Sequence, residues 1–557
     1  MTPKLKNISV VARALGVRAG ELEACGPHKA KINLSILGRL KDQPRSRYIL
    51  VSAICPTALG EGKTVTTIGL SMALNRLKKK TACTLRQASC GPLFGAKGLA
   101  TGGGMSSVEP AADTNLHFTG DMHAVGMANN ILVALTENSV FHGNALKIDP
   151  RSISVRRCID TSDRGLRSIR YQLKSGDQTL DMETGFDITA ASEVMSILAL
   201  CRDAQDLRRR LSHMVVARSL SGEFIRAKDL KGDGLMAALL KDAVKPNLVQ
   251  TSEGTPCLVH AGPFGNISIG SSSIIADRIA LGLCDYVVTE SGFGAESGAE
   301  KFFDIKCRYS TLSPDACVLV CSIRGLKAQS EKFPALSFNK INAALLREDP
   351  QALDQGIEHL KKQIENIAAF GVPVIVALNV FTTDTAGEIE FVKKKALDFG
   401  AVASVETTAW RNGSQGALQL AKAVCDHTNS GKAKLKFLYN EQSSIREKIE
   451  TIAKKIYGAR SVEFSKPAEE VMSAAQGRGF GPLPVCIAKT QFSISHDEKL
   501  RGCPKDFVLP IREIRVAAGA GFILALACCI STMPGLPATP RGEKIDVDAR
   551  GVVKGII

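Results

Sequence analysis

The chain has 557 residues, of which 45% are hydrophobic and 23% are charged, and these proportions exclude a disordered chain and a long coiled coil. Its length exceeds what one ordinary core supports, so we expect two to four domains or one large α/β domain with additions. The net charge of +16 favours anionic partners. Because the positive residues form short clusters without interleaved aromatic residues, solvated helix faces are favoured over nucleic-acid binding.

The sixteen cysteines are scattered and include no C-x-x-C pair. This spacing favours reduced thiols in a cytoplasmic protein over a zinc site or a disulfide framework. The longest apolar run, 516–530, is too short to span a bilayer, so we expect a core segment and no membrane partner. The first residues lack a signal-peptide core. A mitochondrial presequence is the alternative, because four positive residues precede any acidic one: Lys4, Lys6, Arg13 and Arg18.

Short runs of β-branched and apolar residues recur along the chain. They are 48–54, 81–85, 257–261, 286–289, 317–323, 372–380 and 401–407. Helical patterns separate them, for instance at 192–212 and 354–370. Strands that alternate with helices predict crossover connections and a mainly parallel sheet. Ligands of such sheets bind beyond the carboxyl ends of the strands, so the residues after each run are the first candidates for a site.

The stretch PTALGEGKT, residues 56–64, follows the first of these runs and precedes a helical pattern. A strand, a glycine-containing turn and a helix are the setting of a phosphate-binding P-loop, in which free helix N–H groups and a lysine face the phosphates. The usual motif is G-x-x-x-x-G-K-[ST], and Thr57 stands in place of its first glycine. The alternative is a tight turn with an ordinary surface lysine.

Two further stretches carry candidate residues. The glycine-rich segment 95–104 predicts either positive-φ positions that let the backbone approach a ligand or a flexible surface loop. The segment 115–124 holds His117, Asp121 and His123. Gly120 favours a turn there, so hydrogen bonding or proton transfer is preferred over metal binding.

Several motifs stand in one order along the chain: PTALGEGKT, LRQASCGPLFGAKG, NLHFTGDMHAV, GFDITAASEVM, NLVQTSEGTP, EKFFDIKCRY, PVCIAKTQFS and STMPGLP. Their order resembles the formate–tetrahydrofolate ligases, also called formyltetrahydrofolate synthetases, from about residue 10 to the end. The resemblance also accounts for Thr57, because the loop of this family reads P-T-x-x-G-E-G-K.

The resemblance implies an α/β fold in three parts. A P-loop nucleotide and formyl-phosphate domain with a mainly parallel sheet flanked by helices would cover 1–365. A second α/β domain with folate-binding aromatic residues would cover 366–470, and a small C-terminal domain 471–557. The family is a homotetramer that joins formate to tetrahydrofolate through formyl phosphate, with release of ADP and phosphate. Its ATP carries Mg²⁺, a monovalent cation (K⁺ or NH4⁺) supports activity, and its folate can carry a polyglutamate tail.

The resemblance also assigns the nucleotide residues. They are Thr57, Gly60, Glu61, Gly62, Lys63 and Thr64, with the Thr64 hydroxyl on Mg²⁺. Arg86 would hold formyl phosphate, for which a bidentate guanidinium is suited. Without the resemblance, an ion pair with a carboxylate would be the better interpretation of Arg86.

Asp121, with His117 beside it, matches the family residues near the second chemical step. In this step N10 of tetrahydrofolate takes up the formyl group and loses a proton. Asp121 would be the base that accepts this proton, and water and the departing phosphate are the alternatives. Phe381 and Trp410 match the aromatic residues that flank the folate ring, where stacking adds roughly 0.5–1.5 kcal/mol to burial. Without the resemblance, both rings would be interpreted as core packing.

The chain departs from the family pattern at Leu99, which replaces a glycine of the glycine-rich segment. A catalytically impaired relative that binds nucleotide or folate is therefore the first alternative function. A P-loop GTPase or a nucleic-acid-associated NTPase is the second, since Asn379 and Asp384 follow a strand. It is disfavoured because Val380 and Thr382 occupy the lysine and aspartate positions of the base-reading N-K-x-D motif.

Overall fold

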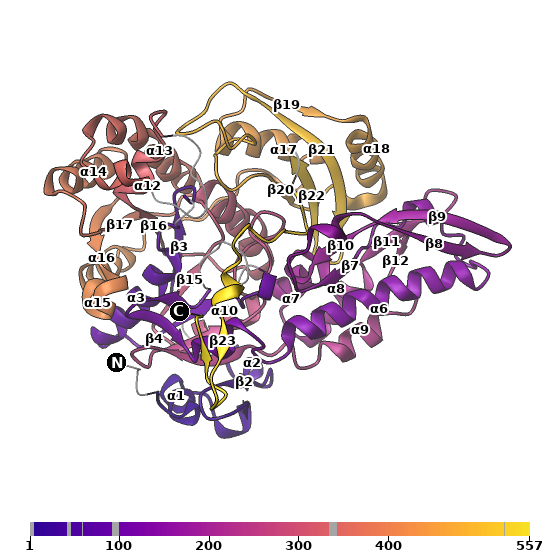
Figure 1. The fold of residues 1–557 in the computed structure, drawn as a ribbon, viewed down its shortest axis with the longest axis horizontal. Helices are drawn as coiled ribbons and strands as arrows, with labels where there is room; N and C mark the ends of the chain where they lie inside the picture. Colours follow the sequence, from indigo (N-terminus) through magenta and orange to yellow (C-terminus); the bar gives the residue numbers. More distant parts are fainter. Residues whose placement is uncertain are drawn as a thin grey trace.

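A computed structural model gives the fold (Figure 1) and describes residues 5–41, 46–57, 60–91, 100–333, 342–527 and 530–556. Its main element is a sheet of 12 strands among these residues. The sheet runs in the order β1 (Leu22–Ala24), β2 (Ala30–Ile32), β13 (Asn247–Thr251), β14 (Pro256–Val259), β4 (Thr81–Leu85), β15 (Tyr286–Glu290), β3 (Arg47–Ala53), β16 (Ala316–Cys321), β17 (Val374–Asn379) and β18 (Ala403–Thr407). The short strands β5 (Gly102–Gly103) and β6 (Ser106–Glu109) join it beside β13.

From β14 to β18 every neighbouring pair of strands is parallel, whereas β1, β2, β13 and β14 pair antiparallel. The predicted α/β class and mainly parallel sheet are therefore confirmed. The predicted run 81–85 coincides with β4, and the ends of the other runs lie within two residues of the observed strand ends. The runs predict the strands well because both faces of a parallel sheet are buried, which demands continuous apolar sequence.

Helices cover both faces of this sheet. Successive side chains of β3 alternate between the faces, so that Ile49 and Val51 join one apolar cluster while Tyr48 and Leu50 join the other. The first face is covered by α3 (Lys63–Arg76), α15 (Ala409–Gly416) and α16 (Leu418–Thr428). The second face is covered by α10 (Ile274–Leu283), α13 (Pro350–Ala368) and α14 (Ala386–Asp398).

An elongated arm projects from the sheet, with the β8–β9 hairpin at its far end (Figure 1). Its elements are α6 (Asp121–Phe141), β7 (Arg157–Ile159), β8 (Ile169–Ser175), β9 (Gln178–Thr184), β10 (Phe186–Ile188), α7 (Glu193–Leu200), α8 (Ala204–Ser212), β11 (Val215–Arg218), β12 (Phe224–Arg226) and α9 (Asp233–Leu239). The helical pattern over 192–212 forms two helices, α7 and α8, instead of one continuous helix. Two helices form because the Asp203 carboxylate accepts a hydrogen bond from the Asp206 N–H and caps α8 as a new helix start.

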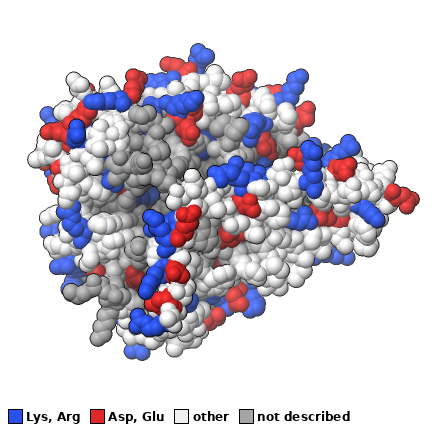
Figure 2. Space-filling model, in the orientation of Figure 1, with Lys and Arg blue, Asp and Glu red and all other residues white. Residues whose placement is uncertain are grey.

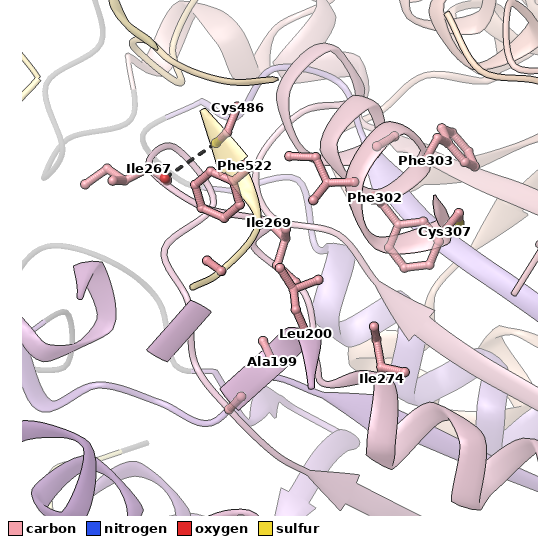
Figure 3. Close-up of a cluster of buried hydrophobic side chains, with 14 of the residues drawn as sticks. Ala199, Leu200, Ile267, Ile269, Ile274, Phe302, Phe303, Cys307, Cys486 and Phe522 are labelled. Carbon is pink, nitrogen blue, oxygen red and sulfur yellow. Dashed lines mark hydrogen bonds between the residues drawn. The ribbon is translucent and has the colours of Figure 1, made fainter. Parts of the chain in front are cut away.

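The C-terminal part carries a second sheet in the order β19 (Ser461–Phe464), β21 (Val508–Ala517), β22 (Phe522–Ala527) and β20 (Val485–Ala488), with α17 (Ile445–Ile452) and α18 (Lys466–Ala475) beside it. β22 is buried along its length, which confirms that the apolar run 516–530 contributes to the core. Figure 3 shows Phe522 beside Ile269, and the Cys486 thiol donates a hydrogen bond to the Ile267 carbonyl at 3.5 Å. The second sheet therefore packs onto the loop that follows β14.

One apolar cluster runs from Ile8 through the arm to Ala527. The predicted boundary at 365 lies inside α13, and the boundary at 470 lies inside α18. The division into three domains stays a prediction. The remaining elements are α1 (Ile8–Leu15), α2 (Ile36–Arg39), α5 (Ala111–Asn115), α11 (Arg308–Ser310), α12 (Ile323–Lys327), β23 (Asp546–Val547) and β24 (Val553–Lys554), together with short 3-10 and π-helical turns.

Charged side chains are mixed over the face drawn in Figure 2, where lysine and arginine lie among aspartate and glutamate. The excess of positive charge is spread over this face instead of following one stripe. The cysteines within the described ranges are free thiols, and most are buried. In the part of the chain that the structure describes, no helix combines the length and apolarity needed to cross a bilayer.

Candidate active site

The carboxyl ends of the parallel strands bring distant segments of the chain to one edge of the sheet. From β3 the chain crosses to β4 on one side, and from β15 it crosses to β16 on the other. The turn before α3, Arg86 and Glu290 therefore meet at the point where the crossover direction reverses, which is where ligands of such sheets bind. Phe381 and Trp410 follow β17 and β18 at the same edge.

The turn between β3 and α3 contains two glycines with positive φ and leads directly into a helix. Gly60 and Gly62 have φ of +72° and +84°, and α3 begins directly after Gly62. The Thr57 N–H and hydroxyl both donate to Glu61 Oε1, at 3.1 and 2.8 Å. Ser322 donates to the other oxygen of the same carboxylate. Thr57 therefore closes the turn through its side chain, at the place where the usual motif has a glycine.

Gly62 is required by its surroundings as well as by its φ. A Cβ at this position would lie 2.5 Å from Asn379 Nδ2, which donates to the Glu61 carbonyl at 3.1 Å. We expect Gly62→Ala to destabilise the protein by about 1–2 kcal/mol through left-handed backbone strain alone. Thermal unfolding measures this. Gly20→Ala is the matched control, because nothing lies within 4 Å of its Cβ position. Equal melting temperatures for the two variants would contradict the assignment.

Two side chains at the start of α3 face the strand β15 and the loop after it. Lys63 Nζ donates to the Phe293 carbonyl at 2.9 Å, and the Thr64 hydroxyl donates to Glu290 Oε2 at 2.8 Å. Burial lowers the pKa of Lys63 to about 8, with an opposing contribution from Glu290 and a smaller additional lowering from Arg86. The charges of Glu290 and Arg86 are therefore close enough to Lys63 to change its pKa.

Arg86 comes directly after β4 and is held by one backbone contact. Its Nη1 donates to the Pro263 carbonyl at 3.2 Å, while its Nε is buried and has no hydrogen-bond partner among the described residues. Burial lowers the pKa of Arg86, and Glu290 opposes this shift. A buried donor without a partner is costly. An anion bound here would satisfy it.

Asp121 is the first residue of α6 and is preceded by Gly120 with φ +85°, which confirms the turn expected there. The buried Asp121 carboxylate lies 2.7 Å from Lys31 Nζ and accepts from Asn247 Nδ2 at 2.7 Å. His117, by contrast, is exposed to solvent. The structure therefore joins Asp121 to Lys31 and Asn247, residues that the sequence did not suggest.

The two aromatic residues occupy different settings. The guanidinium of Arg324 lies 3.7 Å over the Phe381 ring and covers one of its faces. Trp410 is 58% exposed, and its carbonyl accepts from the Met105 N–H at 2.7 Å. A Cβ at Gly104 would lie 2.9 Å from the indole ring. The indole therefore lies against the end of the glycine-rich segment, with much of its surface open to a ligand.

The glycine-rich segment has the backbone expected of it where it is described. Gly102 and Gly104 have φ of +72° and +60°, so the predicted positive-φ positions are confirmed there. Leu99 and its neighbours from 92 onward lie outside the described residues.

The model of the formate–tetrahydrofolate ligase family matches residues 1–557. The chain belongs to this family. It is 50% identical over 553 residues to a formate–tetrahydrofolate ligase of Roseiflexus sp. (strain RS-1), covering 99% of this chain and 98% of the relative. It is 48% identical to the ligase of Chloroflexus aggregans and 47% identical to ligase 3 of Rubrobacter xylanophilus, each with the same coverage of both chains.

The resemblance found in the motifs is thereby confirmed along the whole length. Membership in this ligase family suggests a metal-binding role for the Thr64 hydroxyl and the Glu290 carboxylate. The Thr64 hydroxyl and the Glu290 carboxylate, 2.8 Å apart, offer the hard oxygen ligands that Mg²⁺ prefers, so these residues would suit a magnesium ion. Within the described ranges no group of three or more histidine, cysteine, aspartate or glutamate residues could hold a metal. An ion here would take its remaining ligands from phosphate oxygens and water.

Several residues of the site were not predicted from the sequence. Glu290, Lys31 and Asn247 each contact a predicted site residue across a long sequence separation. Asn379 was considered only for the base-reading motif of the NTPase alternative, and it donates instead to the Glu61 carbonyl. One signal was available for Glu290 and Asn379. Each is the last residue of a strand whose carboxyl end faces the site, and polar residues at that position are candidates in any parallel sheet.

Proposed function

We propose that this chain joins formate to tetrahydrofolate in the cytoplasm with consumption of ATP, and releases 10-formyltetrahydrofolate, ADP and phosphate. One observation carries the proposal. Lys63, Arg86 and the Thr64–Glu290 pair gather beyond the ends of β3, β4 and β15, in a chain that matches a ligase family over its whole length.

In the first step a formate oxygen attacks the γ-phosphorus of ATP, the bond to the bridging oxygen breaks, and ADP leaves. Phosphoryl transfer needs positioning and charge neutralisation more than covalent help. The N-terminus of α3 and Lys63 would bind the phosphates, and Thr64 with Glu290 would hold Mg²⁺. When bound, Mg²⁺ neutralises charge on the phosphate oxygens. Arg86, with its unpartnered Nε, would orient the formyl phosphate that forms.

In the second step N10 of tetrahydrofolate attacks the formyl carbon, the bond from carbon to the phosphate oxygen breaks, and N10 loses its proton. Phe381 and Trp410 would flank the pterin ring. Asp121 and His117 remain the proposed residues near this step. Because Lys31 and Asn247 already donate to the Asp121 carboxylate, we assign Asp121 an orienting role and the departing phosphate the proton.

Further features of the proposal rest on the family alone. They are a homotetramer, a monovalent cation such as K⁺ or NH4⁺, and a folate whose polyglutamate tail would suit the positive net charge.

The pKa of Lys63 predicts a pH dependence of nucleotide affinity. The pKa of Lys63 in the folded protein is about 8, below the ordinary 10.5. In the protein without nucleotide, Lys63 therefore loses its proton as pH rises through about 8. Phosphate binds the charged form, so we expect the dissociation constant of MgATP to rise by up to about tenfold per pH unit above that point. Titration calorimetry between about pH 7 and about pH 9.5 measures this. Lys63→Arg should flatten the profile, because arginine stays charged. The same inflection in both proteins would contradict the assignment.

The proposed function is tested by supplying the purified protein with ATP, Mg²⁺, K⁺, formate and tetrahydrofolate. We expect formation of 10-formyltetrahydrofolate and phosphate in equal amounts, and none when formate is omitted. ATP binding without product would instead identify an impaired relative. Nucleic-acid binding that weakens steeply with salt, together with no folate affinity, would support the NTPase alternative.

A further inference from the structure

Two buried polar side chains of α13 reach the nucleotide end of the sheet. His359 and Gln363 are one helical turn apart, and both side chains are fully buried. Buried polar groups reduce stability unless they are hydrogen-bonded. Neither residue is among the proposed substrate contacts, so their hydrogen-bond partners indicate what they do.

His359 joins the start of the phosphate-binding turn to the C-terminal part. Its Nε2 accepts from the Cys55 N–H at 3.1 Å, and its Nδ1 donates to the Gly502 carbonyl at 2.7 Å. The carbonyl can only accept and the amide can only donate, so the imidazole is held as one neutral tautomer. Because Pro56 has no N–H, the Cys55 amide is the last backbone donor before Thr57. His359 therefore fixes the entry to the turn.

Gln363 holds the loop that follows β15, which forms one wall of the same site, whereas the turn entered at Cys55 forms the other wall. Its Nε2 donates to Glu296 Oε2 at 2.7 Å, and its Oε1 accepts from the Glu296 N–H at 3.1 Å. Glu296 comes three residues after Phe293, whose carbonyl accepts from Lys63. The two walls also touch directly, since a Cβ at Gly294 would lie 3.0 Å from the Cys55 Cα. Gln363 therefore fixes the loop that positions the lysine.

The C-terminal segment 489–502 contacts Glu296, His359 and the end of α12. Lys489 Nζ lies 3.7 Å from Glu296 Oε1, and the Gly502 carbonyl accepts from His359. Arg501 Nη1 donates to the Ala328 carbonyl at 3.1 Å, directly after α12. α12 is capped by Ser322, which also donates to Glu61 of the turn. The segment therefore reaches the phosphate-binding turn through α13 and through α12.

We propose that His359 and Gln363 are positioning residues that hold the two walls of the nucleotide site and couple them to the C-terminal segment 489–502. Nucleotide binding at the turn and the order of this segment are then linked in both directions. The inference rests on the proposed function of the turn as a nucleotide site.

Two substitutions of His359 separate its two contacts. Asparagine keeps a donor where Nδ1 lies and loses the acceptor for the Cys55 N–H, whereas glutamine keeps that acceptor and loses the donor to Gly502. We expect His359→Asn to raise the KM for MgATP about tenfold, because a buried N–H loses its partner, and His359→Gln to change it by less than about twofold. The KM values for formate and tetrahydrofolate should stay constant. Gln355→Ala, on the exposed side of the same helix, is the matched control.

A purely structural role would lower the melting temperature of both variants and leave their KM values for MgATP equal, which would overturn the proposal. The coupling is tested in the unmodified protein by amide hydrogen exchange. MgADP should slow exchange in 489–502 there, and this slowing should be lost in His359→Gln. Unchanged exchange in the unmodified protein with bound MgADP would overturn the inference alone, whereas failure to bind MgADP or MgATP would overturn the proposed function.

Discussion

Replacement of Arg86 by alanine is expected to lower the ligation rate about 10²–10³-fold, while the affinity for MgATP changes by less than about threefold. The reason is the position of the guanidinium. It comes from β4, contacts only the Pro263 carbonyl through Nη1, and keeps a buried Nε without a partner in the described part of the chain. Such a donor suits an anion that exists only after phosphoryl transfer. The rate of 10-formyltetrahydrofolate formation and the MgATP dissociation constant measure the two effects.

Arg86→Lys sharpens this test. Lysine keeps the positive charge but loses the planar guanidinium that can donate two parallel hydrogen bonds. The ligation rate of this variant should therefore lie between the rates of the unmodified protein and the alanine variant. An equal loss of MgATP affinity and ligation in Arg86→Ala would show that this residue binds nucleotide, and would contradict the assigned role.

Replacement of Lys63 by alanine is expected to damage both properties. Its ammonium stands at the start of α3 beside the turn, so removal takes a charge from the ground-state complex and from the transition state. We expect MgATP affinity and ligation each to fall by about a hundredfold or more, as for other buried charge contacts. Lys79→Ala, at an exposed position soon after the same helix, is the matched control. Normal MgATP affinity in Lys63→Ala would remove the turn from the proposed nucleotide site.

The strands could be predicted from the sequence because a parallel sheet is buried on both faces. The run 48–54 is apolar for that reason, and β3 forms within one residue of it. The positive φ of Gly102 and Gly104 could be predicted from the density of glycines in the segment 95–104. The break between α7 and α8 was missed because the Asp203 cap outweighed an apolar pattern that continues through it.

The partners of the site residues could not be predicted, because they depend on the order of strands in the sheet. Thr64 meets Glu290 only because β15 lies next to β3, although 226 residues separate the two in sequence. Likewise, Lys31 of β2 reaches Asp121 at the start of α6, although 90 residues separate the two in sequence. The sequence supplied the candidate side chains, and the order of the strands determined which residues they contact.

If formate is phosphorylated at this site before it is transferred, formate labelled with ¹⁸O in both oxygens must pass one labelled oxygen to phosphate. The oxygen that attacks the γ-phosphorus stays with the phosphate when the carbon–oxygen bond breaks. Mass spectrometry of the released phosphate should therefore find one labelled oxygen per molecule. Unlabelled phosphate, released together with 10-formyltetrahydrofolate, would show that the formyl group does not pass through formyl phosphate.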